Sequence, residues 1–332
     1  MALIRKINIK AKTEVNSGFG VNTDAYGGRF VNKDGRPNIE KRGLGFLERI
    51  SWYHTMLELS NIKFLLLVVL FYITVNFVFA FLYYLIGPQH LAGIVAQSEI
   101  EKFIECYFFS AQTLTTVGYG RISPVGFVAS SAAAVEALVG LLSLALATSL
   151  LYGRFSKPKA YLRFSHNAVL APFKDGAAIM MRVAPFKNNN LTDAEAKLTA
   201  GIMVEENGKM VNRFYPLELE YSKVNVLTLS WTIVHPITEE SPFYRFTRED
   251  FANTRGEILV FVKAFDDMFS NTVLARSSYT LQEIVQGAKF VPMYHRNDAS
   301  NRTILDLEKT GVYVDANVVL PAEQMSKTAA GS

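Results

Sequence analysis

Two long apolar stretches stand out in the first half of the chain. The first runs from Phe64 to Ile86 and the second from Val125 to Leu151. A helix needs about 20 residues to cross the apolar core of a bilayer, and both stretches are long enough. The pattern therefore predicts an outer membrane-spanning helix over 63–87 and an inner one over 125–153.

A shorter apolar segment lies between the two stretches. Residues Phe103–Thr115 favour a helix that is too short to cross a bilayer, and the sequence T-T-V-G-Y-G over Thr115–Gly120 completes the segment. Non-helical backbone at membrane depth is stable only where it is buried in protein or lines a water-filled pore. We therefore predict a re-entrant pore helix over 103–115 and a loop over 116–120 on the axis of an oligomer.

The composition of this loop is typical of a potassium selectivity filter. Four copies around an axis would point backbone carbonyls, and one threonine hydroxyl, at a dehydrated ion. Turning successive carbonyls the same way requires unusual backbone angles, which glycine adopts at little steric cost. An isolated G-Y-G can also be a surface turn, but the flanking apolar stretches favour the filter. The predicted filter is Thr116, Val117, Gly118, Tyr119 and Gly120, with K+ ligands at Thr116, Val117, Gly118 and Tyr119.

From Tyr161 onward the pattern changes to short segments rich in β-branched and aromatic residues, bounded by Asn, Gly and Pro. This spacing predicts an antiparallel β-sandwich of the immunoglobulin class. Short helices are predicted over Thr247–Ala252, which opens with a Thr-x-x-Asp cap, and over Leu281–Gln286. A hairpin turn is predicted at Glu206–Lys209. The predicted strands are Ala178–Ala184, Lys197–Glu205, Arg213–Tyr221, Val226–Ile233, Glu257–Ala264, Val273–Tyr279 and Val312–Val319.

The predicted fold class is thus an α + β membrane protein, with a two-helix pore domain and a cytoplasmic immunoglobulin-like β-sandwich. The pore domain is expected over 61–156 and the β-sandwich over 157–321. Residues 1–45 are polar and basic, and they predict a cytoplasmic N-terminal segment. Residues 46–60 predict an amphipathic helix at the membrane interface, with an ordinary linker helix as the alternative. The tail over 322–332 is expected to be disordered.

Charge sets the expected orientation. Basic residues are concentrated before the first stretch and after the second, whereas the connection between them holds only Lys102 and Arg121. By the positive-inside rule, both termini are expected in the cytoplasm, in a cell inner (plasma) membrane. The net charge of +4 is too small to indicate a nucleic-acid partner.

Enzymatic activity is not expected. The single cysteine, Cys106, excludes an intrachain disulfide and any cysteine-rich metal site. The sequence shows no catalytic triad, metal-ligand spacing or phosphate-binding loop. We therefore expect no cofactor, with K+ as a permeant ion only. The scattered histidines are His54, His90, His166, His235 and His295.

Several motifs resemble the inward-rectifier potassium channel family, most closely its prokaryotic members. Arg29–Glu40 resembles the family's N-terminal R-F-V-x-K-D-G segment, and Phe109–Thr113 resembles its F-S-x-[EQ]-T pore helix. Lys157–Lys159 resembles the K-P-K that follows the inner helix. His235–Phe243 and Ala275–Tyr279 resemble the H-x-I-x-E-x-S-P-L and R-S-S-Y elements of its cytoplasmic domain.

The resemblance implies a homotetramer that conducts K+ passively and is gated at the inner helices by the cytoplasmic domain and by anionic lipids or phosphoinositides. Polyamines, Mg2+ and Ba2+ are the blockers that it implies. One alternative is another two-span potassium channel with a different ligand sensor. A second is a non-conducting, membrane-tethered β-sandwich that binds a partner.

The resemblance also implies roles for residues of the membrane region. Leu144, Thr148 and Tyr152 are spaced four apart, so they share one helix face. The family implies that this face lines the pore and that Tyr152 lies at the gate, whereas the alternative packs it on the outer helix. Leu144 stands where strong rectifiers carry an acid. Glu136 is implied to lie behind the filter near Gln112 and to brace it, whereas the alternative is a protonated residue with a purely structural hydrogen bond. Gln112 replaces the acid of the acid–arginine strut in eukaryotic members, so support of the filter is expected to differ.

Two sets of charged residues have implied roles at the cytoplasmic side. Basic residues around the inner-helix end are implied to bind anionic lipid, although positive-inside topology alone explains them equally well. Glu195 and Asp267 align with acids that ring the family's cytoplasmic pore, and ordinary surface acids are the alternative. The candidate lipid-binding residues are Arg49, Arg154, Lys157 and Lys159.

Overall fold

The computed structural model of the chain describes residues 7–8, 10–13, 29–43, 45, 51–206, 209–297 and 301–330. The chain divides into two units, each with its own core. One unit comprises Arg42–Lys157, and the other comprises Met1–Lys41 together with Pro158–Ser332.

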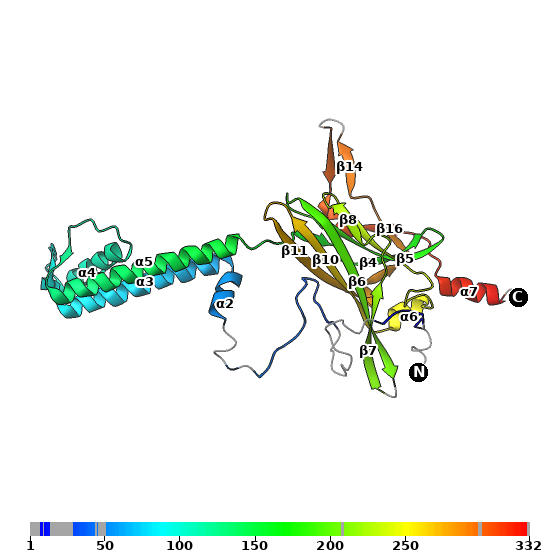
Figure 1. Ribbon diagram of the computed structural model, residues 1–332, viewed down its shortest axis with the longest axis horizontal. Helices are drawn as coiled ribbons and strands as arrows, with labels where there is room; N and C mark the ends of the chain where they lie inside the picture. The colour runs from blue at the N-terminus through cyan, green and yellow to red at the C-terminus, as the bar shows by residue number, and fades with distance from the viewer. Residues whose placement is uncertain are drawn as a thin grey trace. The chain divides into compact units, whose positions relative to one another are not determined.

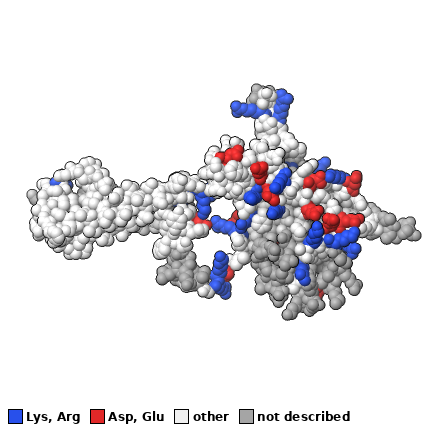
Figure 2. Space-filling model, viewed as in Figure 1, with Lys and Arg blue, Asp and Glu red and all other residues white. Residues whose placement is uncertain are grey.

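The first unit is helical (Figure 1). Two of its helices, α3 and α5, are long and apolar enough to cross a membrane, with mean hydropathies of 2.7 and 2.0. Figure 2 shows these helices almost free of charged residues on the visible face. Both predicted spans are thus present as helices. The helices of this unit are α2 (Trp52–Glu58), α3 (Asn61–Ile86), η1 (Pro88–His90), α4 (Glu99–Leu114) and α5 (Phe127–Phe155).

Local signals fix where these helices begin and end. The Ser60 side chain caps the start of α3, and Gly87 ends it with a φ of 111°. Ser98 and Glu101 form a capping box at the start of α4, so this helix begins at Glu99 rather than at Phe103 as predicted. The predicted start follows the apolar pattern, which the charged first turn of α4 does not share.

The prediction of an interfacial helix over 46–60 is tested only in part. Within the described residues, α2 covers Trp52–Glu58, with Trp52 and Tyr53 largely exposed. Residues 46–50, including the candidate lipid ligand Arg49, lie outside the described residues.

The second unit is a sandwich of two five-stranded sheets (Figure 1). The first sheet has the order β11-β10-β6-β7, with β8 also paired to β6, and all of its pairs are antiparallel. The predicted hairpin is present, since Glu206 pairs with Lys209. The strands are β6 (Leu191–Glu206), β7 (Lys209–Leu217), β8 (Lys223–Val226), β10 (Gly256–Asp266) and β11 (Asn271–Thr280).

The second sheet has the order β12-β4-β5-β3, with β9 also paired to β5. Only the β12–β4 pair in this sheet is parallel. Buried apolar residues of both sheets, such as Ile179 and Val260, belong to one cluster that also includes Phe243, Phe246 and Phe251. The strands are β3 (Leu162–Phe164), β4 (Ala168–Phe173), β5 (Gly176–Pro185), β9 (Trp231–Pro236) and β12 (Ile284–Gln286).

Smaller elements complete this unit. Strand β13 pairs with β16, and β14 with β15 forms a hairpin that projects from the sandwich in Figure 1. The remaining elements are α6 (Arg248–Asn253), η2 (Leu281–Glu283), β13 (Ala288–Phe290), β14 (Tyr294–Asn297), β15 (Arg302–Leu305), η3 (Leu307–Gly311), β16 (Tyr313–Asp315) and α7 (Pro321–Ala330).

Several predicted boundaries are wrong. The predicted strand Val226–Ile233 is the end of β8 and the start of β9, because the chain leaves the first sheet at Leu227 and joins the second at Trp231. The predicted helix Leu281–Gln286 is one turn of η2 followed by β12. Residues Val312–Val319 contain only the three-residue strand β16. Apolar composition alone does not distinguish these short pieces.

The composition predicts a disordered tail over 322–332, but most of this tail is helical. Residues Pro321–Ala330 form α7. The Glu323 carboxylate accepts a hydrogen bond from the Leu320 amide at 3.2 Å and another from Arg248 Nε at 3.2 Å. These contacts fix the first turn of α7 to α6, a partner that lies far away in the sequence.

An N-terminal strap, Arg29–Asn38, packs on the first sheet of the same unit. The guanidinium of Arg29 donates to the Ser278 carbonyl and to Glu283 Oε2, both at 2.8 Å. Buried Glu257 accepts hydrogen bonds from the amides of Phe30 and Val31. The polar, basic composition of the N-terminal segment does not predict this docking, which the buried carboxylate acceptor on β10 explains.

His235 on β9 is buried, and each of its two ring nitrogens has a hydrogen-bond partner in the same unit. Its Nε2 lies 2.8 Å from Ser241 Oγ, and its Nδ1 lies 2.6 Å from the Glu218 carbonyl oxygen. Burial lowers the pKa of His235 to about 4. An unfolded histidine has a pKa of about 6.5. Between these values the unfolded chain binds more protons, so the folded state loses stability as the pH falls.

We therefore expect the free energy of unfolding to fall by roughly 3 kcal/mol between pH 7 and pH 4 through this residue alone. Denaturation can be followed by the fluorescence of Trp231, which is buried, in a Trp52→Phe background that removes the other tryptophan. His235→Gln should remove this part of the pH dependence, whereas His295→Gln, at an exposed position, should retain it. Equal pH dependence in both variants would contradict the assignment.

Candidate functional site

Helix α4 positions the predicted filter segment. The amides of Val117 and Gly118 donate to the Gln112 carbonyl at 3.0 and 3.3 Å. The values of φ are 62° at Thr116, 51° at Gly118 and 81° at Gly120. Positive φ at alternate positions departs from an extended strand, in which successive carbonyls point opposite ways. The sequence predicted this backbone for the glycines but not for Thr116, where a side chain makes positive φ uncommon.

The loop also leaves apolar surface uncovered in the single chain. Val117 is 53% exposed and Tyr119 is 79% exposed. A Cβ added at Gly118 or Gly120 would meet no other atom within 4 Å. Exposed apolar side chains next to two apolar spans indicate a surface that associates with further protein.

A buried polar cluster lies behind α4 and joins all three long helices. Glu136 of α5 accepts a hydrogen bond from the hydroxyl of Tyr83 on α3 at 2.6 Å and another from Ser110 of α4. The Ser110 hydroxyl also lies 3.1 Å from Oδ1 of Asn76 on α3. These four residues are at most 1% exposed. Buried polar groups need such partners, because leaving them unpaired in an apolar environment is costly.

This cluster changes the expected support of the filter. The resemblance implies that Glu136 supports the filter together with Gln112; the hydrogen-bond partner of Glu136 on α4 is Ser110. Gln112 supports the segment through its main-chain carbonyl. The sequence signal for the additional members is a polar residue within an apolar span, and Asn76 and Ser110 both fit that signal.

The inner helix approaches the end of α4 without an intervening side chain. A Cβ added at Gly140 would lie 2.0 Å from the Leu114 carbonyl oxygen, which is far inside normal contact distance. Gly140 is buried. This glycine therefore sets the distance between α5 and the residues that lead into the filter segment.

Contacts of Arg121 hold the chain directly after the predicted filter segment. The guanidinium of Arg121 donates to Glu105 of α4 and lies 3.5 Å from the Gly93 carbonyl. Shortly after Arg121, strand β2 (Ser123–Pro124) pairs with β1 (Leu91–Ala92), which precedes α4 in the chain. This Glu105–Arg121 pair was not predicted; Arg121 directly follows the motif, but Glu105 lies within α4, away from it in the sequence.

One face of α5 is largely exposed in the part of the chain that the structure describes. Leu144 is 65% exposed and Tyr152 is 74% exposed, and Thr148 between them is also exposed. The Thr148 hydroxyl donates to the Leu144 carbonyl at 2.8 Å. Their exposure within the described part of the single chain disfavours the alternative that this face packs on the outer helix.

Of the candidate lipid-binding residues, Arg49 lies outside the described residues, and the other three differ in their surroundings. Lys157 and Lys159 are exposed, and they fall in different units of the chain. Arg154 instead makes hydrogen bonds to the carbonyls of Met56 and Leu59, each at 2.7 Å. The structure thus separates Arg154 from the two lysines by its contacts.

The candidate acids of the cytoplasmic pore lie in the first sheet and its loops. Glu195 on β6 is paired in register with Lys223 and Lys263, and its Oε1 lies 3.9 Å from Lys197 Nζ. Asp267 accepts a hydrogen bond from the Thr192 hydroxyl at 3.1 Å. Lysines around Glu195 reduce its field, which favours the alternative of an ordinary surface acid for this residue.

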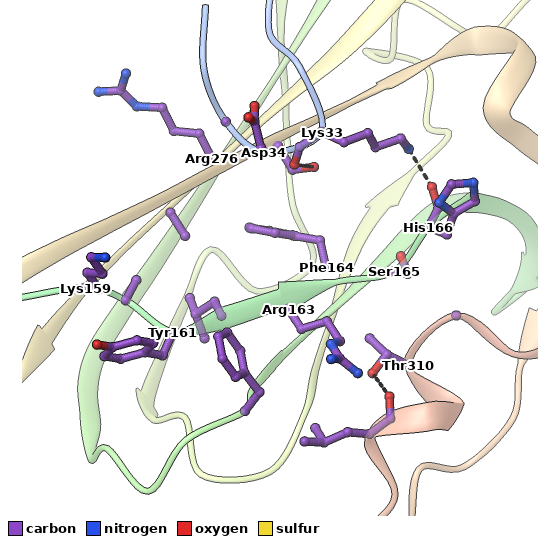
Figure 3. A pocket seen from close by; sticks show the side chains of 18 of the residues that line it. Lys33, Asp34, Lys159, Tyr161, Arg163, Phe164, Ser165, His166, Arg276 and Thr310 are labelled. Carbon is purple, nitrogen blue, oxygen red and sulfur yellow. Dashed lines mark hydrogen bonds between the residues drawn. The ribbon is translucent and has the colours of Figure 1, made fainter. Parts of the chain in front are cut away.

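The second unit also has a cavity of about 1190 Å3 next to the strap. Figure 3 shows Lys33 and Asp34 of the strap on one side of the cavity, with His166 beside Lys33. Arg163 lies across the cavity from them, and Lys159 also lines it. Lys33 donates to the His166 carbonyl, and burial lowers its pKa despite the nearby Glu283 carboxylate. The cavity wall thus combines the segment that precedes α2 with the segment that follows α5 in the sequence.

The chain matches two families of known proteins. Residues 162–328 match the family described as "Inward rectifier potassium channel C-terminal domain". Residues 67–157 match the family described as "Ion channel". The two matches together span the apolar helices and the β-sandwich.

Individual relatives cover most of the chain. It is 34% identical over 295 residues to the inward rectifier potassium channel Kirbac3.1 of Paramagnetospirillum magnetotacticum, an alignment of 87% of this chain and 97% of that protein. It is 27% identical over 319 residues to the G protein-activated inward rectifier potassium channel 4 of Bos taurus, covering 87% of this chain and 71% of the relative. Spo0M of Bacillus subtilis, a sporulation control protein of known structure, aligns with a TM-score of only 0.22 at 6% identity, over 39% of this chain and 50% of Spo0M.

The close approach at Gly140 generates a stability prediction. Gly140→Ala should destabilise the helical unit by about 1–3 kcal/mol, because the added methyl group meets main-chain atoms that cannot move aside. Cys106, the single cysteine, is buried in the same core and reports its opening through reaction with a maleimide dye during heating in detergent.

Gly153→Ala is the matched control on the same helix. Its added Cβ would lie 3.2 Å from the side-chain ends of Leu57 and Tyr53, which can shift. We expect a clearly smaller decrease in the temperature of dye reaction. A Gly140→Ala protein that melts like the unsubstituted protein would contradict the close approach of α5 to α4.

Proposed function

The chain belongs to the inward-rectifier potassium channel family, and from this premise we propose that four copies form a channel that conducts K+ passively. The observation that carries the proposal is the segment Thr116–Gly120 at the end of α4, with positive φ at alternate positions. In a tetramer, its carbonyls would replace the hydration shell of the ion at several successive sites. Repulsion between neighbouring ions would keep any one of them from binding too tightly to leave.

Electrostatics favour a cation below this filter. Helix α4 ends at Leu114, directly before the filter segment. The carboxyl end of a helix carries a partial negative charge, equivalent to about half an elementary charge. Four such ends around one axis would stabilise a K+ ion in the cavity without binding it through a side chain.

The proposed gate is the exposed face of α5. Leu144 and Tyr152 would narrow the pore and exclude water from it, with Thr148 as the polar residue between them. Because Leu144 carries no charge, block of the inner cavity by polyamines or Mg2+ should be weak. Glu195 and Asp267 would supply the cytoplasmic vestibule with at most a modest cation site.

The proposed control of the gate comes from the cytoplasmic unit and from anionic lipid. Lys157 and Lys159 follow α5 and are exposed, so they are suited to lipid phosphates at the membrane surface. Each basic residue near an anionic leaflet contributes about 1 kcal/mol of attraction. Arg49, close to α2 in the sequence, would add to this attraction. The channel would lie in the cell inner membrane with both termini in the cytoplasm.

One alternative, another two-span potassium channel with a different ligand sensor, has less support than the proposal. The match of residues 162–328 to the cytoplasmic domain of inward rectifiers disfavours a two-span channel with an unrelated sensor. A non-conducting membrane-tethered module differs from the proposal in one measurable property, the flux of K+.

The proposal predicts K+-selective flux in liposomes that contain the purified protein. Uptake of K+ should exceed uptake of Na+, stop with Ba2+ and disappear in Gly118→Asp, whose side chain disrupts the glycine-dependent backbone. Tyr152→Ala should raise the flux several-fold, because it removes the bulk of the proposed gate.

Leu146→Ala is the control for the gate, since Leu146 is an exposed apolar residue on the other side of the same helix. Its flux should match that of the unsubstituted protein. No K+ flux from a tetrameric protein, even with Tyr152→Ala, would refute conduction and favour the non-conducting module.

A further inference from the structure

Arg154 lies in the last turn of the inner helix, directly after Gly153 and close to the proposed gate residue Tyr152. Its guanidinium reaches across to the junction of α2 and α3. Nη1 donates to the Met56 carbonyl at 2.7 Å, and Nη2 donates to the Leu59 carbonyl at 2.7 Å. Nη2 also donates to Oδ1 of Asn61 at 2.7 Å. One side chain therefore contacts the end of α2 and the start of α3.

These carbonyls belong to the carboxyl end of α2. Met56 lies in its last turn and Leu59 is the residue that ends it. The last carbonyls of a helix have no partner within the helix and carry its negative dipole end, so a cation satisfies both needs. Helix α2 has no basic residue in its own last turn. Arg154 of α5 supplies that cation from another helix.

Two further contacts fix the same junction. The Arg154 guanidinium stacks over the ring of Phe64 on α3, 4.6 Å from its centroid. At Gly153, an added Cβ would lie 3.2 Å from Tyr53 Oη and from a methyl group of Leu57 on α2. Helix α2 thus packs directly on the α5 backbone, beside the hydrogen bonds of Arg154.

We infer that Arg154 is a latch that couples the position of α2 to the end of the inner helix, and that it acts as a positioning residue for the gate. This inference rests on the proposed function, because it takes Tyr152 as the gate. The α5 end cannot move relative to α2 without breaking three charge-assisted hydrogen bonds and the stacking on Phe64. The Arg154 contacts therefore transmit a displacement of α2 to the gate. This route is separate from the covalent connection that follows Phe155 at the end of α5.

The geometry separates this role from that of a lipid ligand. An arginine has five N–H donors in a planar fork, and here both terminal nitrogens already donate to protein oxygens. Three of the five N–H groups are thus directed at protein oxygens, which leaves fewer donors for a lipid phosphate. Lys157 and Lys159 are exposed and remain the candidates for lipid.

Arg154→Lys distinguishes the two roles. Lysine retains the positive charge, and with it the attraction to anionic lipid, but a single ammonium does not reproduce the planar fork of arginine. As a latch, Arg154→Lys and Arg154→Gln should both change K+ flux about tenfold and in the same direction, since a hydrogen bond to a charged group contributes about that factor or more. As a lipid ligand, only Arg154→Gln should change the flux and its dependence on anionic lipid, and this result would overturn the inference.

Two further variants test whether the effect passes through the gate. Asn61→Ala removes one acceptor without changing the charge of the protein, so it should shift the flux in the same direction as Arg154→Lys by a smaller factor. In a Tyr152→Ala background, Arg154→Lys should leave the flux unchanged, although it still lowers the temperature at which Cys106 reacts with dye. A purely structural role would lower flux and melting temperature together in both backgrounds, and would overturn the inference.

A measurement without conduction separates this inference from the proposed function. Spin labels at Thr55→Cys on α2 and Ser149→Cys on α5, both at exposed positions, can be placed in a Cys106→Ser background. The distribution of distances between the two spin labels in the full-length protein should broaden in Arg154→Lys and in Arg154→Gln. Lys157→Gln is the control, and its distribution should not change. Distances that stay narrow in both Arg154 variants would overturn the latch, whether or not the protein conducts K+.

Discussion

The helical unit depends on one constraint, which is that a carboxyl group buried among apolar helices must find its partners within the protein. Glu136 meets this requirement through Tyr83 of the outer helix and Ser110 of the pore helix, and Ser110 extends the cluster to Asn76. Three helices therefore share one set of hydrogen bonds. A pore helix too short to cross a bilayer gains from this cluster a fixed orientation that apolar packing alone would not specify, because apolar contacts have no direction.

The same region shows how a short loop is held in an unusual conformation. Gly140 allows the inner helix to touch the Leu114 carbonyl, and the Gln112 carbonyl accepts two amides of the loop. Beyond the loop, Arg121 contacts Glu105. Backbone in a sparsely populated region persists only where its surroundings hold it, and Thr116 has a positive φ between these two anchors. The segment is thus supported at both ends by contacts within its own unit.

The helical unit and the β-sandwich are connected in the sequence by two segments, and both have specific contacts. The strap before α2 is fixed to the first sheet by Arg29 and Glu257. Directly before the other segment, Arg154 in the last turn of α5 donates to the carbonyls of Met56 and Leu59, and the chain then continues into β3. Contacts made by arginine forks and a buried carboxylate provide more stiffness than exposed lysines, whose ammonium groups stay solvated.

The sequence by itself determined the two apolar spans, the short helix between them and the β-rich second half, because each of these depends on local composition and periodicity. It also determined the family, through motifs that the matches to known proteins confirm. Only the tertiary structure decided which polar residues meet: Ser110 rather than the Gln112 side chain beside Glu136, Glu105 beside Arg121, and Arg154 on the end of α2. It also decided that Val226–Ile233 divides between two sheets and that the tail forms α7. The physical reason is that these outcomes depend on partners distant in the chain, and neither hydrophobic period nor charge pattern contains the position of a distant partner.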